Sequence, residues 1–468
     1  AKFTVDARYI GKGDILYTWS PDSKLVAATG SSRVVQILDR FGALIDQVVP
    51  PSASVCTMLC WNKTSDMLAI IQKNSKILTL YNLKSRKSKH EKISVTGKHI
   101  SIIRWSPGSV DQIAIAMSNG NLLLYNVGND DYSATYNSGK KRVVSLAWSE
   151  TDIDTGCCFL ACSFEDALLA VLTEKLVLTQ ELRIKQNQLT PTDLLFCPAN
   201  NQMLCGRIQN GKRSLLMILS LSATEKKHRR NSVETHGSET ASVASEVSSE
   251  DTNFIGLSGA LEFDDSYGQI VCYDWYKDDK VVVGFRFGIV LLVHVEFGED
   301  SILLQQTRGV FHRGILLNDV SVSSLNGLCA FCGNASLWLF NINDLISENR
   351  INIKCTVEKT TVLENELDAL GSEKLVQVQW TGDGKMVSVS TCAGCLYSFD
   401  VLSFDEIEEL ARAKSLSFLN MIMKPIPLSE LAATYCVSLL CLTFGLSSYM
   451  DVPILALTRV IFGQPCVI

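Results

Sequence analysis

Read at a period of two, the stretch Ile102–Asn126 contains three short runs rich in hydrophobic residues. The runs are Ile102–Trp105, Ile113–Met117 and Leu122–Tyr125, and Ser-Pro and Asn-Gly stand in the gaps between them. Short hydrophobic runs bounded by turn residues are typical of β-strands, and both dipeptides favour turns. The stretch therefore predicts three antiparallel strands in sequence, the last of which ends in an aromatic residue followed by Asn.

The same pattern recurs along most of the chain. In the first four units the tryptophans are spaced by 42, 44 and 43 residues. This is the period of the WD40 repeat, about 40–45 residues, in which four strands form one blade of a β-propeller. In two degenerate units Phe196 and Val322 take the place of tryptophan. The predicted structural blade residues are the tryptophans that end the first strand of their units: Trp19, Trp61, Trp105, Trp148, Trp275 and Trp380.

The predicted fold is an all-β WD40 β-propeller over residues 1–402. A β-sandwich also has regularly spaced strands, but it does not repeat one turn and one aromatic residue at a fixed period. The chain has eight units, and we favour seven blades, with eight as the alternative, because seven is the commonest ring and two units are degenerate. Residues 1–18 are expected to supply a strand that pairs with the last blade, since closure of the ring removes an exposed sheet edge.

One low-complexity insertion interrupts the repeat at residues 223–253. It is dense in Ser, Thr and Glu and has almost no large apolar residues. Such a segment cannot offset its ordering entropy by burial, so we expect a disordered loop. Ser232 stands two residues after the pair Arg229-Arg230, a pattern that basophilic kinases accept, and is a candidate phosphosite.

The pattern changes after the eighth unit. Residues 403–427 are expected to form a connector, and residues 428–468 an apolar tail of uncertain origin. The 20-residue stretch Leu431–Met450 contains no charged residue and is long enough for a membrane span. Its polar residues and the lack of a basic flank favour instead the incomplete core of a second domain, or a chain end that departs from the functional protein.

Composition narrows the classes of function. The net charge is −6 with 20% charged residues, and nucleic-acid binders normally carry a basic face, so a nucleic-acid partner is not expected. The 16 cysteines form no short disulfide framework and indicate reduced, buried thiols. The first residues contain no apolar stretch of the kind that marks a secretory signal.

Candidate chemistry is sparse. The sequence contains no nucleotide-binding loop, nucleophile elbow or metalloprotease motif. Two Cys-x-x-Cys pairs, Cys329/Cys332 and Cys392/Cys395, could in principle form a Cys₄ zinc site. Because they belong to neighbouring units, separate blades would hold them apart. We therefore expect no catalytic residue, no cofactor and no metal, and predict that the protein is not an enzyme.

Two basic stretches, Lys84–Lys92 and Lys140–Arg142, follow the second unit and precede the fourth. The simpler interpretation is that the first is a solvated loop between blades. The alternative is a contact patch for an acidic partner or a membrane surface, which the two stretches would share if they lie on one rim.

Two further stretches go beyond a generic propeller. Leu38–Gly42, with the letters LDRFG, ends the first unit, and Tyr267–Phe285 contains the run IVCYDWY. Both resemble the WD repeat-containing protein 19 family, the core WD40 subunits of intraflagellar transport complex A. The resemblance covers about residues 10–424, and nothing after Leu428 is similar to the family.

The resemblance implies a non-enzymatic scaffold for retrograde ciliary transport and for the admission of membrane cargo into cilia. The implied partners are other subunits of the complex and ciliary membrane cargo or adaptors, with membrane contact only indirect. The implied location is the cilium or flagellum, the basal body and the cytoplasm. There are two alternatives. The first is a phosphoinositide-binding propeller, whose motif has two adjacent arginines, whereas the nearest match here, Phe285–Gly288, has a single arginine. The second is a substrate receptor of a ubiquitin ligase.

Overall fold

The computed structural model describes residues 3–94, 97–137, 139, 141–153, 156–183, 190–211, 213–221, 258–277, 279–297, 302–311, 316–334, 336–342, 358–359 and 374–401. All structural statements concern these residues. The predicted insertion at 223–253, the connector at 403–427 and the tail at 428–468 lie outside them. In the described part no helix is long and apolar enough to cross a membrane.

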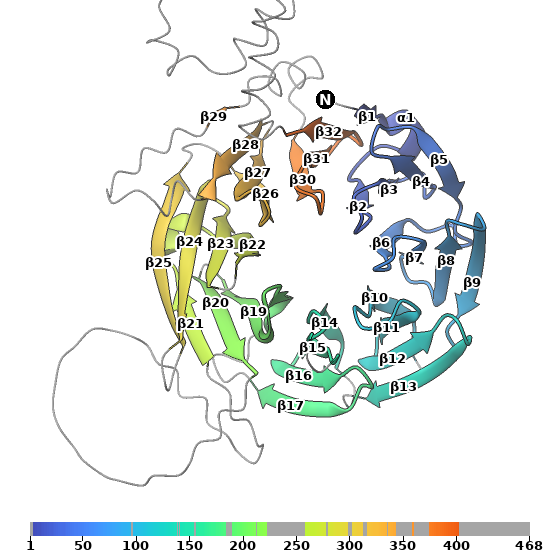
Figure 1. Ribbon diagram of the computed structural model, residues 1–468, viewed down its shortest axis with the longest axis horizontal. Helices are drawn as coiled ribbons and strands as arrows, with labels where there is room; N and C mark the ends of the chain where they lie inside the picture. The colour runs from blue at the N-terminus through green and yellow to red at the C-terminus, as the bar shows by residue number, and fades with distance from the viewer. Residues whose placement is uncertain are drawn as a thin grey trace, which may run out of the picture.

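Eight four-stranded antiparallel sheets form a ring, and within each sheet the strands follow one another outward from the axis (Figure 1). Blade 1 contains β2 (Leu16–Trp19), β3 (Leu25–Thr29), β4 (Val35–Asp39) and β5 (Leu44–Val48). Blade 2 contains β6 (Cys56–Trp61), β7 (Met67–Gln72), β8 (Ile77–Asn82) and β9 (Lys87–Lys92). Blade 3 contains β10 (Ile100–Trp105), β11 (Gln112–Met117), β12 (Asn121–Asn126) and β13 (Asp131–Asn137). Blade 4 contains β14 (Val143–Trp148), β15 (Phe159–Phe164), β16 (Leu168–Thr173) and β17 (Leu178–Arg183).

The second half of the ring is built in the same way. Blade 5 contains β18 (Thr192–Cys197), β19 (Asn200–Asn210), β20 (Arg213–Ser220) and β21 (Ser258–Glu262). Blade 6 contains β22 (Ile270–Tyr276), β23 (Lys280–Phe285), β24 (Ile289–Phe297) and β25 (Ile302–Phe311). Blade 7 contains β26 (Leu317–Ser323), β27 (Leu328–Gly333), β28 (Ser336–Asn341) and the two-residue β29 (Glu358–Lys359). Blade 8 contains β30 (Leu375–Trp380), β31 (Met386–Thr391), β32 (Leu396–Asp400) and β1 (Phe3–Val5).

The N-terminal strand closes the ring. β1 pairs antiparallel with β32, from Phe3 opposite Ser398 to Val5 opposite Leu396. This confirms the expected closing strand within residues 1–18. The favoured count of seven blades is wrong, and the alternative of eight holds, because Trp19 and Trp380 belong to two separate complete sheets. The units with Phe196 and Val322 also form four-stranded sheets, so loss of the tryptophan does not remove a blade.

The hydrophobic core lies between neighbouring blades. Ile71 and Leu80 of blade 2 pack in one buried cluster with Ile103, Trp105 and Ile115 of blade 3. Strands buried on both faces need apolar side chains on both, which explains continuous apolar runs such as β11. The inner strands of seven blades also share an irregular pairing, in which the register shifts near the start of the strand, as at Ile100/Ile102.

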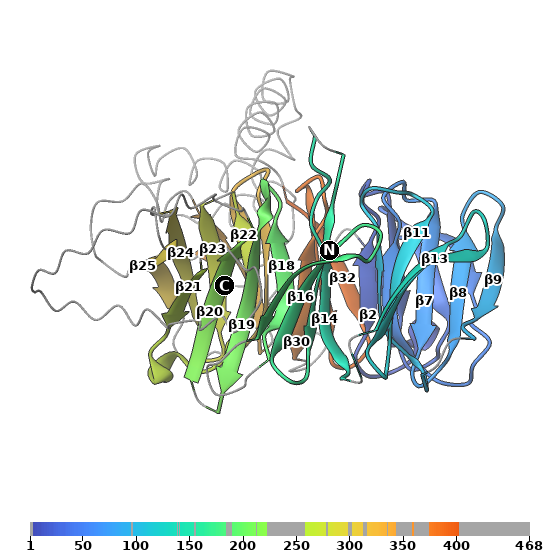
Figure 2. The same ribbon diagram turned by 90° about the horizontal axis from the view of Figure 1, so that it is seen from below.

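The antiparallel order divides the turns between two faces of the ring, seen edge-on in Figure 2. Rim A carries the turns from the first to the second strand and from the third to the fourth, such as residues 20–24 and 40–43 in blade 1. Rim B carries the turns from the second to the third strand, such as residues 30–34, and the linkers between blades. A short helix, α1 (Ala7–Ile10), capped by Asp6, connects β1 to blade 1.

The first basic stretch is a strand and not a loop. Residues 87–92 form β9, the outermost strand of blade 2, which pairs with β8 along its whole length. Lys84 and Arg86 precede it on rim A, whereas Lys141 and Arg142 lie in the linker to blade 4 on rim B. The loops of the two basic stretches therefore lie on opposite rims.

Candidate functional site

Five tryptophans link their blades to the preceding ones. The indole Nε1–H of Trp105 donates to the carbonyl oxygen of Cys60 at 2.8 Å, and Cys60 directly precedes Trp61. Four other tryptophans make the equivalent hydrogen bond with donor–acceptor distances of 3.1–3.4 Å: Trp61 to Thr18, Trp148 to Arg104, Trp275 to Leu195 and Trp380 to Ser321. The indole thus contributes both buried area and a specific donor at each of these blade junctions.

The same bonds identify the residues that replace tryptophan. The acceptor for Trp275 is the carbonyl oxygen of Leu195, which precedes Phe196, and the acceptor for Trp380 is that of Ser321, which precedes Val322. Phe196 and Val322 therefore occupy the positions that the repeat assigns to them. Phe196 is 4% exposed, whereas Val322 is half-buried.

Trp19 differs because it lies at the closure of the ring. Its Nε1–H donates to Oγ of Ser388 at 2.9 Å, and Ser388 in turn lies 3.0 Å from Oγ of Ser398. Tyr17, two residues earlier, donates its hydroxyl to the carbonyl oxygen of Ser388 at 2.9 Å. A hydrogen-bonded side-chain network therefore replaces the usual carbonyl acceptor where the two ends of the propeller meet.

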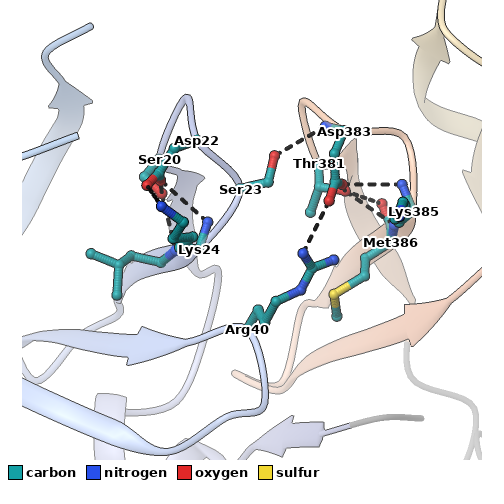
Figure 3. Close-up of polar contacts among 10 residues, drawn as sticks. Ser20, Asp22, Ser23, Lys24, Arg40, Thr381, Asp383, Lys385 and Met386 are labelled. Carbon is teal, nitrogen blue, oxygen red and sulfur yellow. Dashed lines mark hydrogen bonds and ion pairs between the residues drawn. The ribbon is translucent and has the colours of Figure 1, made fainter. Parts of the chain in front are cut away.

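Figure 3 shows the rim A side of this closure. Arg40 of blade 1 forms an ion pair with Asp383 of blade 8, with 3.0 Å between Nη1 and Oδ2. The Asp383 backbone N–H donates to Oγ of Ser23 at 3.0 Å, and Thr381 donates to Asp383 Oδ1 at 2.6 Å. Burial raises the pKa of Asp383, but hydrogen bonds from Thr381, the Lys385 N–H and Arg40 outweigh it and lower the pKa overall. The carboxylate is therefore held in its charged form.

The LDRFG stretch has a physical role in this closure. Its turn carries Arg40 to Asp383, and Gly42 follows with φ of +85°. A Cβ at Gly42 would lie 2.5 Å from Cβ of Phe3 in the closing strand, so only glycine fits there. The stretch thus joins blade 1 to blade 8 through one ion pair and one close backbone approach.

The second notable stretch, Tyr267–Phe285, joins blade 6 to its neighbours. Tyr273 lies two residues before Trp275 and donates its hydroxyl to the carbonyl oxygens of Asp193 and of Cys205, the latter at 3.1 Å. Tyr17 makes the corresponding contact to Ser388. Sequence reasoning missed Tyr17, although the shared Tyr-x-Trp spacing at 17–19 and 273–275 is a signal that could have identified it.

Two half-buried carboxylates connect blade 6 to blade 7 and blade 7 to blade 8. Asp274 accepts the backbone N–H of Val322 at 3.2 Å, and Asp319 accepts that of Val378 at 2.9 Å, so each bond crosses to the following blade. Desolvation raises the pKa of Asp274 to about 7 and that of Asp319 to about 6, against the opposing effect of these backbone hydrogen bonds. Sequence reasoning did not single out either residue.

In blades 2 and 3, a tyrosine at the same position of the third strand contacts the outermost strand of the preceding blade. Tyr81 donates its hydroxyl to Asp46 on β5 at 2.5 Å. Tyr125 accepts a hydrogen bond from Lys89 on β9 at 3.1 Å and donates to Asp130. Lys89 and Asp130 also form an ion pair at 2.5 Å. Part of the basic charge of β9 is therefore used to hold blade 3 against blade 2.

The remaining sequence candidates do not converge on a reactive centre. Among the described residues, no group of three or more His, Cys, Asp or Glu side chains could hold a metal ion. Cys329 and Cys332 lie buried within β27, whereas Cys392 is exposed in the β31–β32 turn. Ser232, the candidate phosphosite, lies outside the described residues.

Two open hollows lie at the junction of blades 3 and 4, one on each rim. The hollow on rim A has a volume of about 390 Å³ and includes Glu174 and Lys175 in its lining. The hollow on rim B has a volume of about 540 Å³ and is lined by Gly97, Lys98, His99, Ser118, Asn119 and Arg142. The two hollows are therefore formed by rim turns and linkers of this one junction.

Comparisons with known proteins assign the propeller to a family. Residues 15–394 match the family described as the WDR19 first beta-propeller. The chain belongs to this family. WD repeat-containing protein 19 of Mus musculus is 24% identical over 393 residues, which is 82% of this chain and 25% of that protein. The Homo sapiens protein of the same name is 24% identical over 392 residues, again 82% of this chain and 25% of the relative.

A nematode relative gives the same result. WD repeat-containing protein dyf-2 of Caenorhabditis elegans is 22% identical over 398 residues, covering 83% of this chain and 24% of that protein. This member of the WDR19 first beta-propeller family therefore spans about a quarter of the length of the relatives that it matches. Among solved structures, the C-terminal WD40 domain of Sif2 is similar in fold, with a TM-score of 0.55 and 15% identity over 84% of this chain and 98% of that domain.

Proposed function

We propose that this chain is a non-enzymatic protein-interaction scaffold of intraflagellar transport complex A. In this role it supports retrograde ciliary transport and the admission of membrane cargo into cilia. The observation that carries the proposal is the match of residues 15–394 to the first propeller of the WDR19 family. The partners are other subunits of the complex and ciliary membrane cargo or adaptors, and any contact with the membrane is indirect. The protein acts in the cilium or flagellum, the basal body and the cytoplasm.

The geometry supports a scaffold because the ring is tied together at its junctions. Tryptophan hydrogen bonds, the Arg40–Asp383 ion pair and the Asp274 and Asp319 bonds connect successive blades. A ring held in this way keeps the turns on both rims in fixed relative positions. Pre-organised surfaces bind partners with a smaller ordering cost, which suits a subunit that has several neighbours.

The phosphoinositide alternative receives less support from the motif that suggested it. Arg286, the single arginine of Phe285–Gly288, donates from Nη1 to the carbonyl oxygen of Leu317 at 3.2 Å and to Oδ1 of Asn318 at 2.7 Å. The guanidinium therefore bridges blades 6 and 7, and Phe285 is buried. No feature of the described residues supports a role as a ubiquitin-ligase receptor.

Affinity purification of the tagged full chain from ciliated cells tests the proposal. We expect mass spectrometry to recover subunits of intraflagellar transport complex A with the parent chain. Arg40→Ala, which weakens ring closure, should recover less of these subunits, whereas Lys24→Ala, which removes an exposed ion pair within one turn, should recover as much as the parent. Recovery of a cullin adaptor instead, or of no transport subunit, would contradict the proposal.

A further inference from the structure

Charge is divided unevenly between the two rims of blades 2 to 4. On rim B, the β7–β8 turn and the linkers that precede β10 and β14 carry exposed or half-buried basic side chains and, in their described residues, contain no Asp or Glu: Lys73, Lys76, Lys98, His99, Lys141 and Arg142. The β15–β16 turn of blade 4 on the same rim carries two carboxylates, Glu165 and Asp166, which form ion pairs with Arg142 and Arg183. On rim A of the same blades, the described turns contain six carboxylates, Asp66, Asp111, Asp130, Glu150, Asp152 and Glu174, against four basic residues, Lys63, Lys84, Arg86 and Lys175. The basic sector of rim B favours an anionic partner.

The hollow of about 540 Å³ lies within this basic sector, at the junction of blades 3 and 4. Its floor is built by Ser118, whose Oγ accepts the backbone N–H groups of Lys98 and His99 at 3.1 and 3.3 Å. These two bonds fix the linker against the β11–β12 turn. They occupy the backbone N–H groups of both residues. The Lys98 side chain lies at the surface, where it has no carboxylate partner among the described residues.

Arg142 lines the same hollow and is oriented by a neighbour. Its Nε–H donates to Oε1 of Glu165 at 2.8 Å, and both side chains are about half exposed. A bond through Nε leaves N–H groups of both terminal nitrogens of the guanidinium available to a further acceptor. Glu165 is therefore a positioning residue for Arg142.

We propose that this hollow binds a phosphorylated side chain within an acidic segment of a partner protein. A phosphoryl group carries about −1.5 to −2 charge and three acceptor oxygens, which a guanidinium fork and an ammonium group can share. Among the described residues, the lining of the hollow contains no large apolar side chain that could insert into a bilayer. A protein ligand is therefore favoured over a membrane surface. The inference rests on the scaffold role proposed above only for its choice of a protein partner.

Binding of fluorescent peptides to the purified full chain tests this inference directly. The probes are a degenerate pool of acidic peptides with a central phosphoserine and the same pool without phosphate, followed by fluorescence anisotropy at low ionic strength. We expect the phosphorylated pool to bind more tightly, inorganic phosphate to compete, and added salt to weaken binding. The variant Lys98→Ala/Arg142→Gln should lose about tenfold in affinity, because charge-assisted hydrogen bonds are removed.

Two control variants and a comparison with anionic lipid vesicles make the result decisive. Lys175→Gln removes a positive charge from rim A of the same junction and should leave binding unchanged. Glu165→Gln keeps the acceptor for Arg142 and removes a negative charge, so it should tighten binding, an effect that unfolding cannot imitate. Equal binding of both pools, equal loss in Lys175→Gln, or stronger binding to anionic lipid vesicles than to phosphopeptide would overturn the inference. Because this assay uses purified components, a negative result would not contradict the affinity purification from ciliated cells, which tests the scaffold role separately.

Discussion

Arg40 and Asp383 are 343 positions apart in the chain, and their side chains form a 3.0 Å ion pair across the closure of the ring. Neither side chain is more than a third exposed. The pair joins blade 1 to blade 8 on rim A, beside the strand that the N-terminus contributes. Closure of the propeller therefore depends on side-chain contacts as well as on the short β1–β32 ladder.

A double-mutant cycle should measure this contribution. We expect Arg40→Ala and Asp383→Ala to show a coupling free energy of about 1 kcal/mol, since a partly buried ion pair exceeds the usual surface value only modestly. Urea unfolding of the two single variants and the double variant gives the coupling, and hydrogen exchange of the β1 amides should accelerate in all three. Strict additivity together with unchanged exchange would mean that the pair does not hold the closure.

Trp105 provides the corresponding test of the blade junctions. Trp105→Ala should lower the free energy of unfolding by about 3–5 kcal/mol, because a large buried side chain is lost. Trp105→Phe should lower the free energy of unfolding by about 1–3 kcal/mol, since phenylalanine keeps a buried aromatic side chain but leaves the Cys60 carbonyl oxygen without its donor. Equilibrium unfolding in urea measures both. An alanine variant that melts within about 2 °C of the parent would contradict the repeat assignment.

The repeat could be predicted from the sequence because tryptophans, turns and alternation recur at one local period. The positions of Phe196 and Val322 followed from that period, and the hydrogen bonds from Trp275 and Trp380 place them there. The favoured number of blades was wrong because the commonness of seven-bladed rings and the two degenerate units were given more weight than the count of eight units, each of which forms its own sheet. Likewise β9 looked like a basic loop, since its charged residues lack alternation and its strand is specified by pairing with β8.

The candidate site was less accessible to sequence reasoning. The Arg40–Asp383 pair and the hydroxyl contacts of Tyr17 connect residues more than 300 positions apart, and no local pattern encodes such contacts. The rim B hollow draws Lys98, Ser118 and Arg142 from two linkers and one turn, which come together only when blades 3 and 4 pack. The basic Lys140–Arg142 stretch was noticed, but its partner Lys98 was not.

Stability should fall as pH rises because of Asp274. Its pKa of about 7 in the folded state exceeds the ordinary value of 3.8, so between these values the folded protein holds an extra proton. The free energy of unfolding then decreases with rising pH, by at most about 1.4 kcal/mol per unit for this group. Asp319, with a pKa of about 6, adds a slope of the same sign at the lower end of this range. Asp274→Asn should therefore reduce the dependence without abolishing it, as measured by urea midpoints at intervals from pH 5 to pH 8.

A matched carboxylate gives the control for this experiment. The pKa of Asp383 is lowered from its ordinary value by hydrogen bonds from Thr381, the Lys385 N–H and Arg40, so Asp383→Asn should leave the slope between pH 5 and pH 8 as in the parent. If Asp274→Asn had the slope of the parent, desolvation of this carboxylate would not govern the pH dependence.

The insertion at 223–253 should be dispensable for folding. Doubling the length of a surface loop costs only about 0.6 kcal/mol, so a ring can carry such a segment with little loss of stability. Replacement of residues 223–253 by a short Gly-Ser linker should leave the melting temperature and cooperativity nearly unchanged. Limited digestion with trypsin should cut the parent first near Lys226–Arg230. First cuts within the blades would show that the prediction of a disordered loop is wrong.

The central claim, a scaffold role in retrograde ciliary transport, is tested most directly by tracking the fluorescently tagged chain along cilia of living cells. The account predicts particles that move from the ciliary tip toward the base together with another subunit of the transport complex. Arg40→Ala should reduce the fraction of moving particles, and Lys24→Ala should not. Diffuse signal without directed movement, or movement independent of the complex, would contradict the account.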